Sequence, residues 1–211
     1  GALACQLKTG DHVVASKALF GSCYQIITAI LPRFGITHTL VDGNDLQAWK
    51  AAFTPNTKAV FLETPSNPTL QIVDMAAVGE LAKKHGACFI VDNIFATPIL
   101  QRPLEFGADV IVYSGTKHMD GQGRVLGGAI VSTRQFKEEL LKPFLRHTGP
   151  SLSPFNAWVL LKGLETLKLR VEAQSQSAES VAQHLSAMKG VSRVLYPTLD
   201  KHPGSDIAKR Q

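Results

Sequence analysis

The stretch DVIVYSGTKHMDGQG, residues 109–123, decides the fold and raises the first question about function. Its apolar run VIVY ends abruptly in Ser114, Gly115, Thr116 and Lys117. A continuous apolar run of this length is typical of a strand in a sheet that helices cover on both faces. A charge at the end of a buried strand is costly unless it is used or neutralised. Lys117 is therefore a candidate functional residue.

Similar runs alternate with helical patterns on the N-terminal side of this stretch. The sequence predicts strands at 11–16, 36–42, 57–64, 87–92, 108–114 and 127–132, and helices at 22–34, 44–53 and 74–87. Ser22 is the expected N-cap of the first helix. In the third, Asp74 is the expected cap and Gly86 the expected stop. The alternation predicts an α/β fold with a mostly parallel sheet flanked by helices.

The character of the sequence changes beyond residue 153. Residues 153–188 read as one or two long helices, and VSRVLYP at 191–197 reads as a new strand. We therefore expect a large domain at 1–150, a helical connection at 151–190, and the start of a small C-terminal α/β domain at 191–211. The chain begins GALACQLKTGD and ends SDIAKRQ, and we expect a longer protein cut at both ends.

Composition narrows the class of protein. The 211 residues are 45% hydrophobic and 18% charged, which is enough for one sizeable core. No apolar window has the length of a membrane span, so no membrane partner is expected. The net charge is +5, but the basic residues are scattered, so no nucleic-acid partner is expected. Cys5, Cys23 and Cys88 show neither metal nor disulfide spacing, which favours reduced thiols and a cytoplasmic location.

Polar and aromatic residues gather where predicted strands end. In a helix-covered sheet, ligands bind beyond the carboxyl ends of the strands. The residues that follow those ends are Phe20, Asn67, Asp92, Ser114, Thr116 and Lys117. Each has an ordinary structural explanation, since such residues cap turns, satisfy local backbone groups or pack in cores. Together they meet the needs of pyridoxal phosphate: a lysine for its aldehyde, a carboxylate for its pyridine nitrogen, hydroxyls for its phosphate and an aromatic ring for stacking.

The segment GQGRVLGG, residues 121–128, offers a competing interpretation. Its glycines resemble those of a dinucleotide-binding loop. The spacing is G-x-G-x-x-x-G, however, and a predicted strand follows where a Rossmann site needs a helix N-terminus. We expect these glycines to turn the chain tightly beside the cofactor instead.

Longer motifs resemble one family. ETPSNPTLQIVDM, IVDNIFATP, VYSGTKHMDGQG, LSPFNAWVLLKGLETLKLR and VLYPTLDKHPGSDIAKRQ resemble the Cys/Met-metabolism family of fold-type I pyridoxal-phosphate enzymes. The resemblance covers nearly the whole chain. Within the family, ALFGSCYQI and TKHMDGQGRVLGG are most similar to the O-succinylhomoserine sulfhydrylases.

The resemblance implies a role for each residue at the strand ends. Lys117 would form the Schiff base with the cofactor and act as the catalytic residue, and Asp92 would pair with the pyridine nitrogen. Ser114 and Thr116 would hold the phosphate. Asn67 would contact the phenolic oxygen of the cofactor.

The same resemblance implies an activity and its alternatives. It implies γ-replacement on O-succinylhomoserine with sulfide, which gives homocysteine in methionine biosynthesis. It also implies a homo-oligomer, in the family a tetramer, whose subunits share active sites. Glu63 would support the pocket and Phe20 would stack on the ring, although many members carry a Tyr at the position of Phe20. Cystathionine γ-synthase and γ-lyase activities stay open, as does a fragment that binds cofactor without catalysis. No metal is expected.

Overall fold

The computed structural model describes residues 1–211 and is built around one six-stranded sheet with the order β2-β1-β3-β4-β5-β6. The strands are β1 (His12–Ser16), β2 (Thr37–Val41), β3 (Thr57–Glu63), β4 (Cys88–Asp92), β5 (Val110–Ser114) and β6 (Gly128–Ser132). Neighbouring strands are parallel except for β6, which is antiparallel to β5. All six strands predicted at 11–132 are present, and the α/β fold with a mostly parallel sheet is confirmed.

Helices connect the strands and follow the last of them. They are α1 (Gly21–Gln25), η1 (Ile26–Ile30), η2 (Leu31–Phe34), α2 (Leu46–Ala52), α3 (Met75–Lys84), α4 (Thr97–Leu100), η3 (Pro103–Phe106), η4 (Gly115–Met119), α5 (Arg134–Phe136), η5 (Lys137–Leu141), α6 (Lys142–Thr148), α7 (Pro154–Glu165), α8 (Leu167–Ala187) and α9 (Ser205–Arg210). None has both the length and the apolar composition that crossing a membrane requires.

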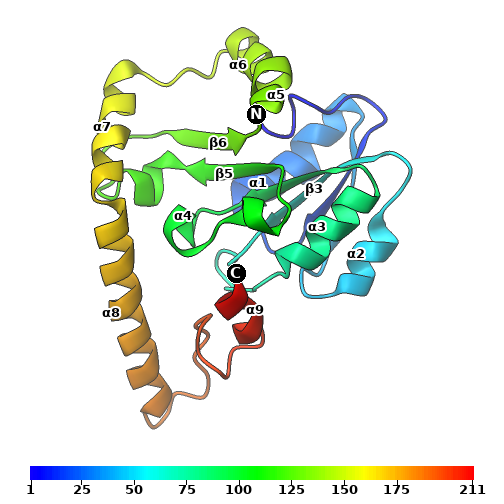
Figure 1. Cartoon of the computed structure of the whole chain (residues 1–211). Helices are drawn as coiled ribbons and strands as arrows, with labels where there is room; N and C mark the ends of the chain where they lie inside the picture. Colours follow the sequence, from blue (N-terminus) through cyan, green and yellow to red (C-terminus); the bar gives the residue numbers. More distant parts are fainter.

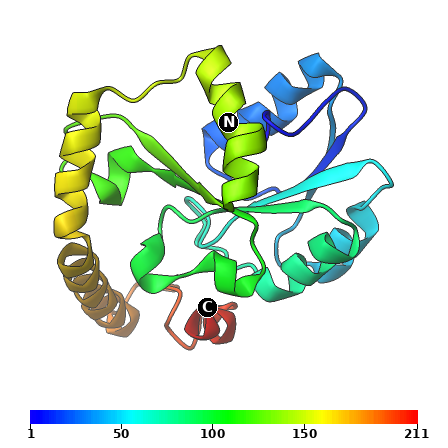
Figure 2. The ribbon, with the colours of Figure 1, turned by 45° about the horizontal axis from the view of Figure 1, so that its top comes forward.

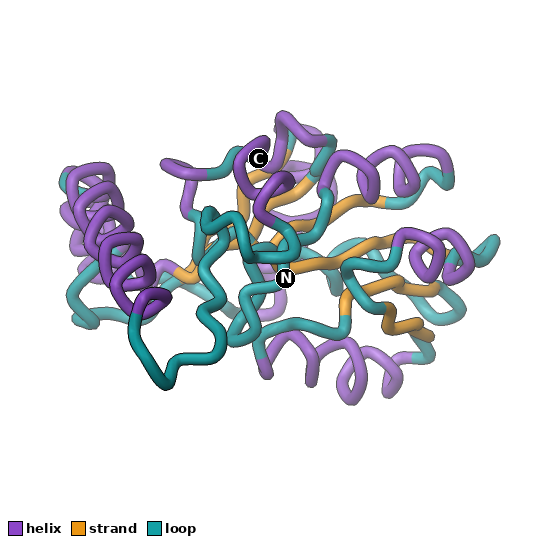
Figure 3. The backbone as a smooth tube through the Cα atoms, turned by 90° about the horizontal axis from the view of Figure 1, so that it is seen from below, coloured by secondary structure: helices purple, strands orange, loops and turns teal.

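Helices lie on both faces of the sheet, as Figures 2 and 3 show, and each face has its own hydrophobic core. On one face, Trp49 of α2 and Val78 of α3 pack with alternate strand residues such as Val14 and Val91. On the other face, Ile27 of η1 packs in one cluster with Val13, Phe61 and Ile90. The strands lie between these layers, and their side chains alternate between the two cores because successive residues of a strand point to opposite faces.

The long helices α7 and α8 run beside the β5–β6 side of the sheet, and α9 returns beneath it (Figure 1). The return is held by polar contacts. Nε2 of His202 lies 2.9 Å from the carbonyl oxygen of Leu70, and the backbone N–H of Met75 donates to Oε1 of Gln211 at 2.7 Å. The C-terminal segment therefore packs against the loop between β3 and α3.

Two local predictions are wrong. Residues 191–197 form no strand, because the segment between α8 and α9 has no neighbouring strand with which its backbone could pair. Ser22 is not a helix N-cap: α1 begins at Gly21 after Phe20, whose side chain cannot accept a hydrogen bond. The predicted helix at 22–34 is also divided into three successive stretches, whereas Asp74 does cap α3 through the backbone N–H of Ala77.

Candidate active site

The ends of β3, β4 and β5 direct three polar side chains to the same face of the sheet. Glu63 is the register partner of Asp92, and Asp92 is the register partner of Val112, two residues before Ser114. Phe61, Ile90 and Val112, two positions before the three strand ends, belong to the core on the α1 side. Since residues i and i+2 of a strand share a face, Glu63, Asp92 and Ser114 also face α1.

Glu63 joins two of the predicted site segments. Its side chain is completely buried. Oε2 accepts a hydrogen bond from the backbone N–H of Phe20 at 2.6 Å, and Oε1 accepts one from the backbone N–H of Asn67 at 3.0 Å. The carboxylate therefore holds the loop after β1 beside the loop after β3, and it leaves the half-exposed Phe20 ring, 46% accessible, free to contact a ligand.

Asp92 has weaker partners. Its Oδ1 accepts a hydrogen bond from the backbone N–H of Ile94 at 3.2 Å. The thiol of Cys23, in α1, donates to Oδ2 at 3.8 Å. Cys23 is a neighbour of Asp92 that sequence reasoning missed, because the two residues lie 69 positions apart in the chain.

The electrostatics of this pair are unusual for carboxylates. Burial raises the pKa of Glu63 to about 7, against hydrogen bonds from Phe20 and Asn67 that lower it. Burial likewise raises the pKa of Asp92 to about 6. Neither carboxylate is part of an ion pair. Two neighbouring carboxyls without a cation favour the neutral form, so the site favours a ligand that brings positive charge.

The segment after β5 carries the lysine. Gly115–Met119 forms one turn, but Lys117 has φ −91° and ψ −115°, which interrupts the helical backbone. Thr116 is anchored to the β6 end, since its Oγ1 accepts from the backbone N–H of Gly127 at 3.2 Å. The Lys117 side chain is exposed and its amine forms no ion pair. A neighbouring cleft of about 820 Å³ is lined by Cys23, Tyr113 and Gly127, but by none of the predicted cofactor residues.

Behind the strand ends lies a buried amide network that sequence reasoning also missed. Nδ2 of Asn93 donates to the hydroxyl of Tyr113 at 3.0 Å. Nε2 of Gln101 donates to Oδ1 of Asn93 at 2.7 Å and to the carbonyl oxygen of Thr64 at 2.8 Å. The network links the ends of β3, β4 and β5, so it fixes the spacing between Glu63, Asp92 and the lysine turn.

The chemistry of these groups fits pyridoxal phosphate. A protonated pyridine nitrogen would supply the cation that Asp92 and Glu63 lack, and the exposed amine of Lys117 is free to react with an aldehyde. The hydroxyl of Ser114 does not cap the turn that follows it, which leaves it available for a phosphate oxygen. The structure thus brings Glu63, Phe20 and Asn67 into direct contact and places Asp92, Ser114, Thr116 and Lys117 at adjoining strand ends; their roles toward the cofactor remain predictions.

Comparisons with known proteins agree with this chemistry. Residues 2–211 match the family described as Cys/Met metabolism PLP-dependent enzyme. The chain is 53% identical to an O-succinylhomoserine sulfhydrylase of Mycobacterium tuberculosis over 99% of its own length and 52% of the relative's. It is 40% identical to a cystathionine gamma-synthase of Mycobacterium leprae over its full length and 54% of the relative's. The chain therefore spans about half the length of the curated relatives it matches.

A solved structure shows the same arrangement of elements. The cystathionine gamma-lyase of Lactobacillus plantarum, complexed with L-serine, superposes with a TM-score of 0.95 at 36% identity, over all of this chain and 55% of the other. The fold and the strand-end residues place the chain among the fold-type I pyridoxal-phosphate enzymes. The chain belongs to the Cys/Met metabolism family of these enzymes, and pyridoxal phosphate is the cofactor that this membership assigns.

Proposed function

We propose that the protein containing this chain is a transferase that replaces the γ-succinyl group of O-succinylhomoserine with sulfide, releasing succinate and forming homocysteine. The observation that carries this proposal is the 53% identity, over 99% of the chain, to an O-succinylhomoserine sulfhydrylase. The similarity to the γ-synthase is lower, at 40%. The reaction balances without an oxidant, because sulfide supplies the sulfur and the carboxylate ester supplies the leaving group.

Bound pyridoxal phosphate would supply an electron sink next to the substrate amine. The residues of this chain then have separate tasks. Lys117 would remove the proton from the substrate Cα, take a proton from Cβ as succinate leaves, and return it after sulfide has added at Cγ, since its amine is exposed at the end of β5. Asp92 holds a proton on the pyridine nitrogen, where its burial makes the ion pair strong.

The remaining residues bind and orient. Ser114 and Thr116 hold the phosphate from the lysine turn. Phe20 stacks on the cofactor ring, and Asn67 contacts its phenolic oxygen. Glu63 sets the position of these last two residues through their backbone N–H groups.

Phe20 bears on the alternatives. Its ring can stack but cannot donate a proton, which disfavours eliminations that need a phenol at this position. The similarity to a γ-lyase supports elimination as an alternative, and the similarity to a γ-synthase supports cysteine as an alternative nucleophile. Because the chain covers about half of its relative, a part that binds cofactor without turnover is the third alternative.

The test uses the full-length protein loaded with pyridoxal phosphate. O-succinylhomoserine is offered with sulfide and, separately, with cysteine, and the products are identified. Homocysteine with little cystathionine supports the proposal. Mainly cystathionine would make the protein a γ-synthase, and mainly 2-oxobutyrate would overturn the role given to Phe20.

A variant test assigns the lysine. Lys117→Ala is expected to abolish both turnover and the cofactor label that borohydride fixes to the protein. Lys58→Ala is the matched control, because Lys58 is also exposed but lies at the opposite end of the sheet, at the start of β3. Retained γ-replacement in Lys117→Ala would refute the assignment.

Assembly and location are further proposals. Large apolar side chains stand exposed along α7 and α8, namely Phe155, Trp158, Leu161 and Leu169. Such a surface supports contact with further protein, either the rest of a longer chain or other subunits of a homo-oligomer. The three cysteines are unpaired, which supports the cytoplasm. Light scattering of the purified protein gives its oligomeric state and thereby tests the proposed assembly.

A further inference from the structure

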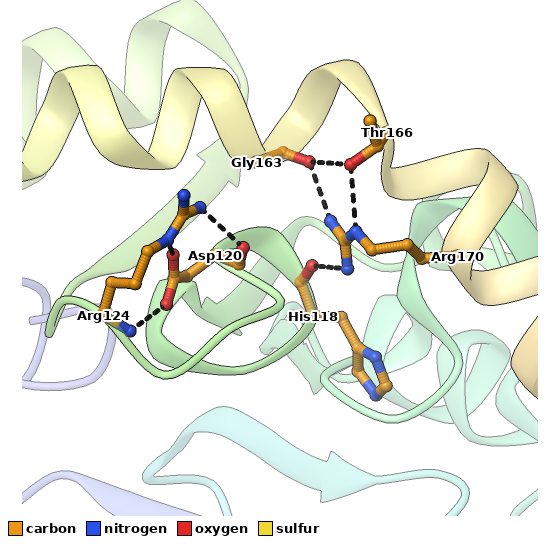
Figure 4. A network of polar contacts seen from close by, with 6 residues as sticks. All are labelled: His118, Asp120, Arg124, Gly163, Thr166 and Arg170. Atoms are coloured by element: carbon orange, nitrogen blue, oxygen red, sulfur yellow. Dashed lines mark hydrogen bonds and ion pairs between the residues drawn. The ribbon is translucent and has the colours of Figure 1, made fainter.

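The lysine turn is held from behind by one arginine of α8. Arg170 lies 52 residues from His118 in the sequence, yet its Nη1 donates to the carbonyl oxygen of His118 at 2.9 Å. Its Nη2 donates to the carbonyl oxygen of Gly163 at 2.7 Å, and its Nε donates to Oγ1 of Thr166 at 3.0 Å. Figure 4 shows the guanidinium between the turn and the junction of α7 with α8. Each of the three guanidinium nitrogens of Arg170 therefore donates a hydrogen bond.

The turn needs such a support. The backbone of Lys117 is not helical, which interrupts the regular turn at the lysine itself. Within the turn, the backbone N–H of Gly121 donates to the carbonyl oxygen of Lys117 at 2.7 Å. The next carbonyl, that of His118, accepts from Arg170. The two carbonyls that follow the lysine Cα are thus fixed by separate donors.

Two glycines make room for this contact. Gly121 has φ +76°, and a side chain there would overlap the guanidinium of Arg170. A side chain at Gly163 would overlap the carbonyl oxygen of Met119. The turn, the guanidinium and the helix junction are therefore packed in direct contact, and a small movement of α8 would reach Lys117.

The charge of the guanidinium is not neutralised by a carboxylate, since Arg170 is part of no ion pair. Burial, and to a lesser degree the charge of Arg170, lowers the pKa of His118. The guanidinium instead binds only carbonyl and hydroxyl oxygens. Its role is consequently geometric, and a lysine at 170, with one point of attachment, would replace it only in part.

We propose that Arg170 is a positioning residue that fixes the peptide between His118 and Met119, one residue beyond Lys117, and thereby the direction of the lysine amine. The inference rests on the proposed role of Lys117. It assigns to α8, which contributes no side chain to the strand ends, a direct effect on the reactivity of the lysine.

The experiment compares Arg170→Gln, Arg170→Lys and the unmodified protein, with Arg33→Ala as the matched control. Arg33 is an exposed arginine in η2, on the far side of the sheet edge. Pyridoxal phosphate is added to cofactor-free protein, the adduct is trapped with borohydride after set times, and labelled Lys117 is quantified by mass spectrometry. Circular dichroism and the melting temperature establish that each variant is folded.

Arg170→Gln is expected to slow the labelling of Lys117 by about 10- to 100-fold, by analogy with the loss of residues that orient metal ligands from behind. Arg170→Lys should fall between it and the unmodified protein, and Arg33→Ala should leave the rate unchanged. The pH midpoint of the cofactor absorbance band should shift in Arg170→Gln, which a merely stabilising role would not cause. If Arg170→Gln fails to fold, Arg170→Lys carries the same two readouts.

The outcomes separate the two proposals. Absence of label on Lys117 in the unmodified protein would overturn the proposed function itself. Label that appears on Lys117 at the same rate in all four proteins, with the same pH midpoint, would overturn the role of Arg170 and leave the proposed function standing.

Discussion

Two regions of this molecule hold buried carboxylates in opposite ways. Asp120, at the end of the lysine turn, has a fully buried side chain whose Oδ1 lies 2.8 Å from Nε of Arg124. Burial would raise the pKa of Asp120, but hydrogen bonds from the backbone and guanidinium of Arg124 outweigh it and lower that pKa. Glu63 and Asp92, at the strand ends, have no cation, and burial raises the pKa of both. Figure 4 shows the first arrangement.

The difference separates structural from functional carboxylates. The chain supplies its own cation to Asp120, so this carboxylate completes the fold around the turn. The strand-end pair has no cation although both residues are buried. Perturbed titratable groups of this kind concentrate at functional sites, because the missing partner comes with the ligand. Four predictions test this contrast.

The largest effect is expected from Asp92→Asn. The amide has the shape of the carboxylate but cannot balance a protonated pyridine nitrogen, so turnover should fall by on the order of 10²–10³, as when one electrostatic partner of a reacting group is removed. The cofactor-free variant should be at least as stable as the unmodified protein, because an unpaired buried charge is removed. Steady-state kinetics and urea unfolding measure the two effects. Undiminished turnover would show that Asp92 does not serve the cofactor.

The second effect is a pH dependence of the cofactor-free protein. The pKa of Glu63 rises from 4.5 to about 7, and that of Asp92 from 3.8 to about 6. Between its unfolded and folded pKa each carboxyl binds more protons in the folded state, so the free energy of unfolding falls as pH rises from 3.8, where Asp92 begins to contribute, to about 7. For Glu63 alone the fall amounts to about 3 kcal/mol.

Urea titrations at a series of pH values measure this slope, and Glu63→Gln is the informative variant. It should flatten the profile, since its amide does not titrate. Saturating pyridoxal phosphate should do likewise in the unmodified protein by supplying the cation. A profile in Glu63→Gln as steep as that of the unmodified protein would mean that Glu63 is already ionised in the fold.

Much of the fold follows from the sequence, and the exceptions have physical causes. Apolar runs such as VIVY before Ser114 identify the strands because a strand covered on both faces must be apolar throughout. Residues 191–197, VSRVLYP, also predict a strand by their local composition but form none, because strand formation needs a neighbouring strand, which local sequence does not report. Asp92 and Lys117 could be selected from their positions after strands. Cys23, Asn93 and Arg170 could not, because each acts through a contact distant in sequence.

The third effect is expected from Asp120→Asn, on the other side of the comparison. The carboxylate whose pKa is lowered contributes stability above its ordinary pKa of 3.8, and that stability is lost as pH falls through the lower folded value. The variant should therefore have a lower melting temperature at neutral pH and a flatter acid limb. At saturating cofactor its turnover should fall much less than that of Asp92→Asn. Calorimetry at several pH values measures the melting temperature and the acid limb. Equal losses of turnover in Asp120→Asn and Asp92→Asn would remove the distinction between the two carboxylates.

The smallest effect concerns Cys23, which touches the strand-end pair without neutralising it. Burial, together with the charges of Asp92 and Glu63, raises the pKa of the Cys23 thiol to about 12. The thiol is therefore protonated at neutral pH and acts as a weak donor to Asp92 rather than as a nucleophile. Cys23→Ser offers a stronger donor and Cys23→Ala offers none, so affinity for pyridoxal phosphate should decrease in the order Ser, Cys, Ala.

Each step in that order should be below about fivefold, because the contact is long and the thiol is a weak donor, and a typical hydrogen bond contributes about 1 kcal/mol. Fluorescence titration of cofactor-free protein measures the affinities, and the unmodified folded protein should leave Cys23 unreactive toward a disulfide reagent. Cys5→Ala is the matched control, since Cys5 is another half-buried thiol that bonds only to the carbonyl oxygen of Ala2. A reversed order would mean that donors compete with the cofactor for Asp92. Asp92 would then have its partner within the chain, as Asp120 does. The contrast between the two regions would no longer identify the cofactor site.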